Sequence, residues 1–305
     1  MVLSLFAPAK INLYLHVGPP RADGRHPLDS LVVFADERVA DIIRYVPGPE
    51  PLCLIVSGPR AGEAELGDPQ DNLVMQAAEA VIRNTERDVT GRLELEKHLP
   101  IAAGIGGGSA DAAATLRVLN RALDLRLSEG ELMDIARPLG GDVPACLAGK
   151  PVLMRGDGDR IEPVTPAPPV LNAVIVNSGR PCPTGAVFQA FDQLSGEKSF
   201  SECSPPSASV VEDWISELSE NYRNDLQEAA RKLVPEVDLT LWRLSRCEGV
   251  RHVAMSGSGA TCFGLFLSAE ESEQAAKAIS QDFPNWFARP TLFGLAGFDL
   301  RPRHA

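Results

Sequence analysis

The stretch that decides the fold is residues 99–111, where a run of small residues leads into a helical pattern. Its sequence is Leu99-Pro100-Ile101-Ala102-Ala103-Gly104-Ile105-Gly106-Gly107-Gly108-Ser109-Ala110-Asp111. Beyond it, apolar residues recur at spacings of four, three and four, which predicts a helix with one apolar face: Ala112, Leu116, Leu119 and Leu123. Glycines let backbone N–H groups approach an anion, and a helix N-terminus adds unpaired donors and partial positive charge. The stretch therefore predicts a phosphate-binding loop.

Two familiar phosphate motifs do not fit this loop. A P-loop requires Lys-Ser or Lys-Thr after its last glycine, whereas this chain has Ser109-Ala110, and a dinucleotide fingerprint fits the glycines only with the wrong spacing. A flexible turn ahead of a packing helix is an equally good local interpretation. Ser109 can cap the helix, or it can reach a phosphate or the metal ion that accompanies one.

The composition indicates a two-domain globular protein rather than a nucleic-acid or membrane protein. The 305 residues exceed the usual size of one core, and the 44% hydrophobic content is ordinary for a globular chain. A net charge of −12 argues against nucleic acid and anionic membranes as partners, so an anionic substrate needs a local positive site. The six cysteines are scattered, the start lacks a basic leader, and no apolar run could span a membrane. We expect a cytoplasmic protein.

Strand and helix patterns alternate along the chain, which predicts an α+β fold. In the first half we expect strands around 11–17, 31–35, 40–46, 52–57 and 93–95, a helix from Asn72, and a capped helix from Ser128 to Pro138. In the second half we expect strands at 170–176, 250–255, 260–266 and 288–297, and helices from Thr184, within 210–247 and after Ser268. Prolines at 166, 168 and 169 mark a boundary. We predict domains over 1–160 and 161–305.

Three further features can carry chemistry, each beside a simpler alternative. Asp142 precedes Val143-Pro144 and is an acid–base candidate, although an aspartate before a proline is also a good helix N-cap. Lys10 and Asn12 share the polar face of a half-buried strand, where lysines are usually solvated. The cluster Ser256-Gly257-Ser258-Gly259-Ala260 is either a tight turn or a glycine wall against which the first loop packs.

The order of these motifs resembles the GHMP kinase superfamily over nearly the whole chain. Within it, the similarity is to the kinases that phosphorylate the 2-hydroxyl of 4-diphosphocytidyl-2-C-methyl-D-erythritol in the non-mevalonate route to isoprenoid precursors. The matching segments are Pro8-Ala9-Lys10-Ile11-Asn12-Leu13, Asp23-Gly24-x-His26, Gly106-Gly107-Gly108-Ser109, Gly141-Asp142-Val143-Pro144 and Pro183-Thr184. The resemblance implies an N-terminal mixed α/β nucleotide-binding domain and a C-terminal ferredoxin-like domain. It also implies ATP as co-substrate, Mg²⁺, a small cytidine-diphosphate-linked substrate and a monomer or weak homodimer.

The resemblance also implies a role for each matching residue. Asp142 would accept the proton of the 2-hydroxyl, and Lys10 would hold both groups in place. Asn12 and Thr184 would contact the erythritol-phosphate end, while His26 would hydrogen-bond the cytosine and Phe188 would stack on it. Residues 100–110 would surround the ATP phosphates with Ser109 nearest the metal, and Lys97 and Asn72 would contact the nucleotide. Positioning and charge neutralisation dominate phosphoryl transfer, so such groups suffice for the reaction.

Two positions depart from that pattern, and two other functions compete. Arg25 stands where the family has an aromatic residue beside cytosine, and its guanidinium plane can stack on a base instead. Asp111 stands where many members have Asn, and we expect it to favour the helix N-terminus rather than bind Mg²⁺. A homoserine or mevalonate kinase lacks the Asp-Gly-x-His turn. An ATP sensor without turnover needs neither Lys10 nor Asp142.

Overall fold

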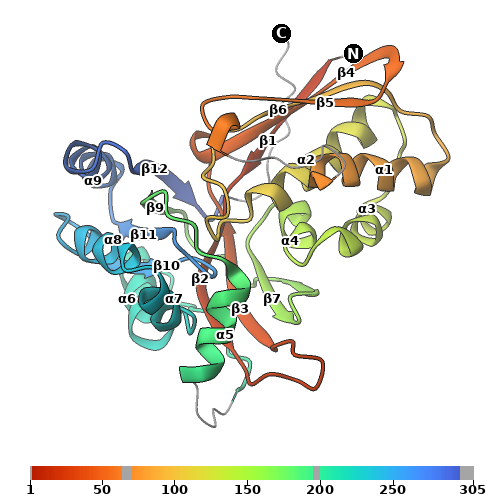
Figure 1. The fold of residues 1–305 in the computed structure, drawn as a ribbon. Coiled ribbons are helices and arrows are strands. Elements are labelled where there is room, and N and C mark those ends of the chain that lie inside the picture. The colour runs from red at the N-terminus through yellow and green to blue at the C-terminus, as the bar shows by residue number, and fades with distance from the viewer. Residues whose placement is uncertain (1, 64–70, 195–199, 296–305) are drawn as a thin grey trace.

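The computed structural model describes residues 2–63, 71–194 and 200–295. Within them lie three four-stranded sheets (Figure 1). The first, in the order β1-β4-β6-β5, comprises β1 (Leu3–Pro8), β4 (Ala40–Pro51), β6 (Thr90–Glu96) and β5 (Cys53–Ser57). The helices of this half are α1 (Leu73–Thr85), α2 (Gly107–Ala122), α3 (Glu129–Ala136) and α4 (Val143–Ala148). Short 3-10 turns lie at Glu37–Val39, Ala61–Glu63 and Arg137–Leu139.

The second sheet lies in the middle of the molecule. Its order is β2-β3-β7-β8, comprising β2 (Lys10–Val17), β3 (Leu28–Phe34), β7 (Val152–Gly156) and β8 (Arg160–Pro163). Figure 1 shows β2 and β3 running between helices α1–α4 on one side and the C-terminal elements on the other. On β3, Leu31 and Val33 belong to a core shared with the C-terminal half, and Val32 and Phe34 to the core under α1 and α2. Both faces of this sheet are therefore buried.

The third sheet has the ferredoxin-like strand order that the family resemblance implies. It runs β10-β11-β9-β12 with every pair antiparallel, and comprises β10 (His252–Met255), β11 (Cys262–Phe266), β9 (Leu171–Asn177) and β12 (Phe287–Phe293). The helices of this half are α5 (Thr184–Leu194), α6 (Val211–Asn221), α7 (Gln227–Leu233), α8 (Glu236–Ser245) and α9 (Ala269–Asp282). The α+β class is confirmed, while the division at residue 160 stays a prediction.

Two local expectations were wrong. Strand β2, expected at 11–17, is not half-buried, because Lys10, Asn12 and Tyr14 on its polar face are buried as well. A β-bulge also shifts its register between Asn12 and Tyr14. Alternation in one strand cannot reveal a second layer on its polar face. Ser109 does not cap α2: Gly106 occupies the N-cap position at φ +61°, and Ser109 lies in the first turn. The glycine can adopt this backbone conformation without strain, which an ordinary cap residue cannot.

The other helix caps expected from the sequence are confirmed. Asn72 caps α1, and both capping boxes, at Ser128 and Ser268, are formed with the glutamate three residues on. Helix α3 ends at Ala136, and a 3-10 turn carries the chain through Pro138. In the part of the chain that the structure describes, no helix is long and apolar enough to cross a membrane.

Candidate active site

A cavity of about 510 Å³ lies where the two halves meet. Its wall comes from the start of β2, the glycine loop, the segment before α4, the N-terminal part of α5 and the turn between β10 and β11. The candidate residues that line it are Lys10, Asn12, Asn72, Lys97, Pro100, Ile101, Ala102, Ala103, Gly104, Gly106, Gly107, Gly108, Ser109, Asp142, Thr184 and Phe188. Ile105 and Ala110 pack into the core instead, with 1% and 3% exposure.

Lys10 and Asp142 form an ion pair inside this cavity. The Nζ of Lys10 donates to the Oδ2 of Asp142 at 2.9 Å, and the lysine side chain is 5% exposed against 33% for the aspartate. Asp142 occupies the N-cap position of α4 but accepts no hydrogen bond from the helix. Its carboxylate therefore binds Lys10, which is 132 residues away in sequence, and does not cap α4.

Asn12 presents an unsatisfied acceptor beside that pair. Its Nδ2 donates to Ser30 Oγ at 2.8 Å, and its backbone N–H donates to Ser256 Oγ at 3.1 Å. The amide oxygen is buried and has no hydrogen-bond partner among the described residues. Because a buried acceptor costs free energy until it is paired, this oxygen is suited to a hydroxyl or amine donated by a ligand.

The glycine loop packs directly on the Ser-Gly-Ser-Gly turn, as the glycine-wall interpretation expects. Thr261 N–H donates to Ala103 O at 3.2 Å, and Ser256 Oγ donates to Gly104 O at 3.2 Å. Gly104 has φ +71°, and a Cβ there would lie 2.6 Å from Gly259 O. The segment is also the tight turn between β10 and β11, so both interpretations hold.

A buried charged cluster of Lys97, Asp41 and Asp111 lies next to the loop. The sequence motifs include Lys97 and Asp111 but not Asp41. Lys97 Nζ lies 2.5 Å from Asp41 Oδ2 and 2.8 Å from Asp111 Oδ2. The other oxygen of Asp41 accepts the backbone N–H groups of His98 and Leu99, just before the loop. Burial lowers the pKa of Lys97, but the two carboxylates outweigh that effect and raise it. Asp41 is an isolated aspartate in a strand, with no motif to single it out.

A second cavity, of about 620 Å³, adjoins the first through Leu28 and Phe188, which line both. His26 lies here, with Nδ1 2.8 Å from Gly18 O and its ring 5.1 Å from that of Phe188. Arg25 also lines this cavity, but its guanidinium is exposed and 3.7 Å from Asp157, which also pairs with Arg21. The structure thus places Arg25 and His26 in the second cavity and not in the wall of the glycine-loop cavity.

Comparison with known proteins decides the family. The model of the GHMP kinases N-terminal domain matches residues 72–150, and that of the GHMP kinases C-terminal region matches 208–285. A 4-diphosphocytidyl-2-C-methyl-D-erythritol kinase from Hyphomonas neptunium is 45% identical over 300 residues, covering 96% of this chain and 97% of the relative. The chain belongs to the GHMP kinase family, among the 4-diphosphocytidyl-2-C-methyl-D-erythritol kinases.

Solved structures of GHMP kinases agree with this family assignment. A crystal structure of a 4-(cytidine 5'-diphospho)-2C-methyl-D-erythritol kinase matches with a TM-score of 0.79 and 31% identity, covering 96% of this chain and 99% of that one. A homoserine kinase from Cytophaga hutchinsonii matches with a TM-score of 0.64, 17% identity and coverage of 95% and 94%, which shows the shared fold alone. As a GHMP kinase, the chain is an enzyme with ATP as co-substrate.

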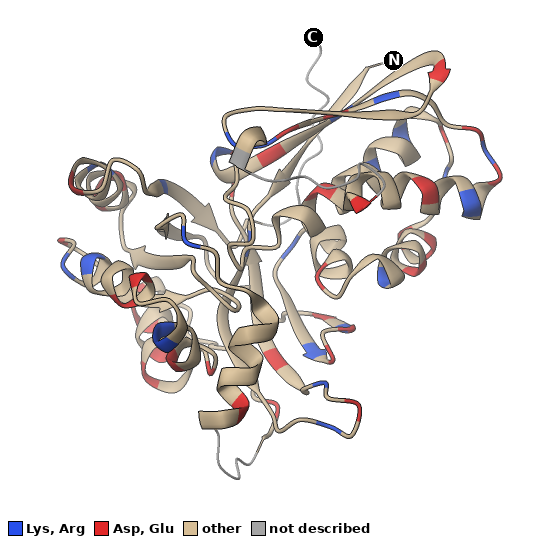
Figure 2. Cartoon of the chain, in the orientation of Figure 1, with Lys and Arg blue, Asp and Glu red and all other residues tan. Residues whose placement is uncertain are grey.

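Acidic residues outnumber basic ones, 41 to 29, and are spread over the outer helices of both halves (Figure 2). An anionic nucleotide is therefore not drawn in by the surface as a whole. Attraction has to come from the local donors: Lys10 in the cavity wall and the backbone N–H groups at the start of α2.

Proposed function

We propose that this chain transfers the γ-phosphoryl group of ATP to the 2-hydroxyl of 4-diphosphocytidyl-2-C-methyl-D-erythritol. The single observation that carries the proposal is the Lys10–Asp142 pair in a cavity that runs from the glycine loop to the cavity of His26 and Phe188. The cavity lined by the glycine loop suits a nucleoside triphosphate. The adjoining cavity offers an aromatic ring and a histidine to a base. A substrate with a hydroxyl at one end and a cytosine at the other fits this layout.

Asp142 acts as the general base in this proposal. Lys10 occupies one carboxylate oxygen, which leaves the other to accept the hydrogen bond of the 2-hydroxyl. As the new O–P bond forms and the bond from the γ-phosphorus to ADP breaks, the hydroxyl proton passes to Asp142. A carboxylate is a weak base toward an alcohol, so proton transfer comes late and orientation of the nucleophile is its main contribution. Lys10 stabilises the negative charge that develops nearby.

The glycine loop holds the triphosphate through its backbone. Residues 100–110 lead into the N-terminus of α2, where Gly106, Gly107 and Gly108 present no side chains to block a phosphate. The Ser109 hydroxyl, in the cavity wall, is the oxygen donor that we assign to Mg²⁺, a cation that prefers oxygen ligands. The ion neutralises phosphate charge when it is bound. Lys97 and Asn72 are assigned to the nucleotide as well.

The cytidine end is assigned to His26, Phe188 and Arg25. Nδ1 of His26 lies 2.8 Å from Gly18 O and Nε2 lies 3.4 Å from Asp192 Oδ1, so a base that hydrogen-bonds this ring takes the place of the Asp192 carboxylate at Nε2. Phe188 stacks on the base, and Arg25 takes part once it leaves Asp157. Asn12, through its unpaired oxygen, and Thr184 hold the erythritol-phosphate end.

ADP release from ATP and Mg²⁺ tests the proposal. The purified chain is assayed with 4-diphosphocytidyl-2-C-methyl-D-erythritol, mevalonate and homoserine in parallel. Turnover on the cytidyl substrate alone is expected, and turnover on another alcohol would contradict the substrate assignment. Asp142→Asn should lose at least about 100-fold in kcat while ATP still binds. Asp124→Asn removes an exposed carboxylate paired with Arg126 and serves as the matched control with unchanged kcat.

The proposal also covers the cellular compartment, the domain boundaries and the oligomeric state. Every described cysteine is a free thiol, which supports a reducing compartment such as the cytoplasm. We assign residues 1–160 to the ATP-binding domain and 161–305 to the second domain, and we propose a monomer or weak homodimer. Sedimentation at several protein concentrations tests the oligomeric state. A tight, concentration-independent oligomer would contradict it.

A further inference from the structure

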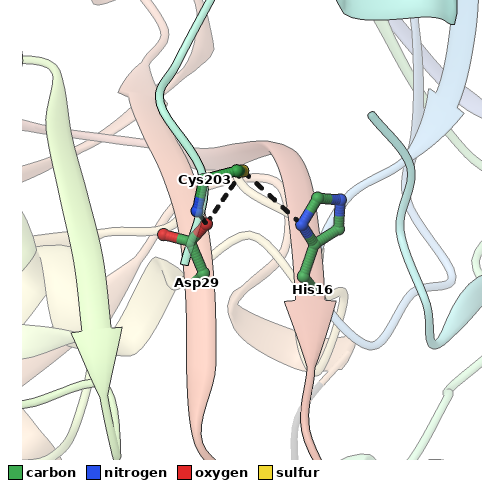
Figure 3. A group of neighbouring side chains, drawn as sticks. All are labelled: His16, Asp29 and Cys203. Carbon is green, nitrogen blue, oxygen red and sulfur yellow. Dashed lines mark hydrogen bonds between the residues drawn. The ribbon is translucent and has the colours of Figure 1, made fainter. Parts of the chain in front are cut away.

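A polar cluster outside both cavities joins three segments of the chain. His16 comes from β2, Asp29 from β3, and Cys203 from the segment 200–210 ahead of α6, which passes close to both strands (Figure 3). The ligand atoms of these three residues all lie within 4.8 Å of one another. Asp29 is fully buried, and the other two are half-buried. None of the three lines either cavity, so the cluster is separate from the proposed kinase site.

The two distances from the Cys203 sulfur are close to the donor spacing of a tetrahedral metal site, and the third donor pair lies within 4.8 Å. Cys203 Sγ lies 3.7 Å from His16 Nδ1 and 3.0 Å from Asp29 Oδ2. Zn²⁺ bonds of roughly 2.0–2.3 Å set neighbouring tetrahedral donors about 3.3–3.7 Å apart. The sulfur–nitrogen distance therefore already fits, and the sulfur–oxygen distance has to open by about half an ångström. One nitrogen, one sulfur and one carboxylate oxygen form a donor set that Zn²⁺ accepts.

Arg155 fixes the carboxylate and the cysteine relative to each other. Its Nε donates to Asp29 Oδ1 at 2.8 Å, and its Nη2 donates to the carbonyl oxygen of Cys203 at 2.6 Å. The backbone N–H of Cys203 also donates to Asp29 Oδ2 at 2.9 Å. Outer contacts of this kind hold metal ligands in orientation before the ion arrives. The Cys203 sulfur faces both the Nδ1 of His16 and the Oδ2 of Asp29.

Two buried polar atoms next to the cluster lack partners. Among the described residues, the hydroxyl of Tyr14 and the Nε2 of His16 make no hydrogen bond. Tyr14 is completely buried, and its hydroxyl lies close to the side chain of Cys203. A water on a bound cation would give it an acceptor or donor.

We propose that His16, Asp29 and Cys203 bind one Zn²⁺ ion, with a water beside the Tyr14 hydroxyl as the fourth ligand. The Cys203 thiol, which donates its proton to Asp29 in the metal-free chain, loses that proton on binding: the S–H bond breaks, the sulfur lone pair forms the bond to zinc, and one proton enters the solvent. The two negative charges of thiolate and carboxylate then balance the ion. The metal ties the loop that carries Cys203 to the central sheet.

Cobalt substitution in the full-length chain tests the site. Chelator-stripped protein is titrated with Co²⁺, whose bond to a thiolate gives a near-ultraviolet charge-transfer band and intense visible bands in tetrahedral sites. We expect saturation at one equivalent, release of one proton, and loss of the bands when one equivalent of Zn²⁺ is added. Absence of the charge-transfer band at one equivalent would overturn the proposal. No nucleotide is present, so the result is independent of the proposed kinase function.

Variants and labelling assign the ligand. The band should vanish in Cys203→Ser and persist in Cys53→Ser, which changes an exposed cysteine on β5. His16→Gln should weaken Co²⁺ binding about tenfold or more. In the wild-type chain, Zn²⁺ should slow maleimide labelling of Cys203 and leave that of Cys53 unchanged, which requires no variant to fold. A band that survives Cys203→Ser, or equal labelling with and without Zn²⁺, would show that Cys203 is not a ligand.

Discussion

At the scale of single residues, Asp111 is the side chain whose ionisation matters most. It shares Lys97 with Asp41, so two carboxylates face one ammonium beneath the phosphate-binding turn. One of its oxygens is buried without a partner among the described residues. Burial raises the pKa of Asp111 to about 7, and Asp41 adds to this rise while Lys97 opposes it. The earlier expectation that Asp111 simply favours the helix N-terminus omits this cluster.

The first prediction concerns Asp111→Asn and pH. The folded chain keeps the Asp111 proton up to about pH 7, while the unfolded chain releases it near pH 4. The folded state thus binds more protons in this window, and the free energy of unfolding of the wild type falls as pH rises through it. Asn cannot ionise, so the free energy of unfolding of the variant, relative to that of the wild type, should rise by on the order of 2–4 kcal/mol between pH 4 and 7. Above pH 7 this difference should stay constant. Urea unfolding at each pH measures this difference.

A pH-independent difference between the two proteins would contradict the assigned protonation. Asp124→Asn is the control, because that carboxylate is fully exposed and its pKa is lowered by Arg126. Its stability relative to the wild type should show no trend between pH 5 and 8.

The second prediction concerns the base contact of Phe188. Stacking of a base on an aromatic ring is worth roughly 1–3 kcal/mol, so Phe188→Ala should raise KM for the cytidyl substrate about 5- to 150-fold. The KM for ATP should stay unchanged, because Phe188 comes from α5 and lies beside His26 where the two cavities adjoin, and it is not part of the glycine loop. Steady-state kinetics with each substrate varied in turn measures both constants. An equal rise in both would indicate a misfolded cleft rather than a lost stack.

At the scale of elements, the contact between the glycine loop and the turn of residues 256–261 sets the shape of the site. Gly104→Ala, the third prediction, places a Cβ 2.6 Å from Gly259 O in a backbone at φ +71°. An L-residue is strained there by about 1–2 kcal/mol, and the backbone contact adds to that cost. The variant should lose at least about 2 kcal/mol in free energy of unfolding and show a raised KM for ATP. Urea unfolding and ADP release measure these quantities.

Gly130→Ala is the matched substitution inside a helix. The nearest atom to a Cβ there is Ser128 Oγ at 3.9 Å, so the change should stabilise α3 by about 0.5–1 kcal/mol and leave KM for ATP unaltered. If Gly104→Ala instead behaved like Gly130→Ala, close packing of the loop on the turn would not be required for function.

Elements with strong local signals were predictable from sequence, and contacts between distant segments were not. The capping boxes at Ser128 and Ser268 and the glycine run before α2 depend on residues within four positions of one another. Asp41 accepts from His98 and Leu99, more than fifty residues away, and nothing in its own strand indicates this. The bulge after Asn12 was missed for a similar reason, because its register depends on β3.

The residues of the candidate site likewise fall into those that local motifs predict and those that only the tertiary structure reveals. Lys10, Asp142 and residues 100–110 were proposed from motif order, and their meeting in one cavity requires the tertiary fold. Ser256 supplies hydrogen bonds to both Asn12 and the glycine loop, yet the sequence marked it only as part of a glycine-rich turn. Such bridging residues have no characteristic spacing, so only the structure could identify them.

At the scale of the whole molecule, the two halves share a hydrophobic core. Leu31 of the central sheet packs in one cluster with Leu171, Ile175 and Phe263 of the C-terminal sheet. The next residue, Val32, faces the cluster that contains Leu116 of α2. The central sheet therefore connects the core under α1 and α2 to the core of the C-terminal half. A cavity built from both halves needs this rigid connection, since its walls must keep their spacing.

The fourth prediction is that the chain unfolds as one cooperative unit. Its three tryptophans, at 214, 242 and 286, all lie in the C-terminal half, so their fluorescence reports on that half alone. Leu116→Ala creates a cavity in the N-terminal core and should cost about 2–5 kcal/mol. Because the central sheet couples the cores, this distant change should lower the urea midpoint measured by tryptophan fluorescence as much as that measured by far-ultraviolet circular dichroism. A tryptophan midpoint that stays at the wild-type value would mean that the halves unfold independently, and the shared core would then contribute little to holding the cleft.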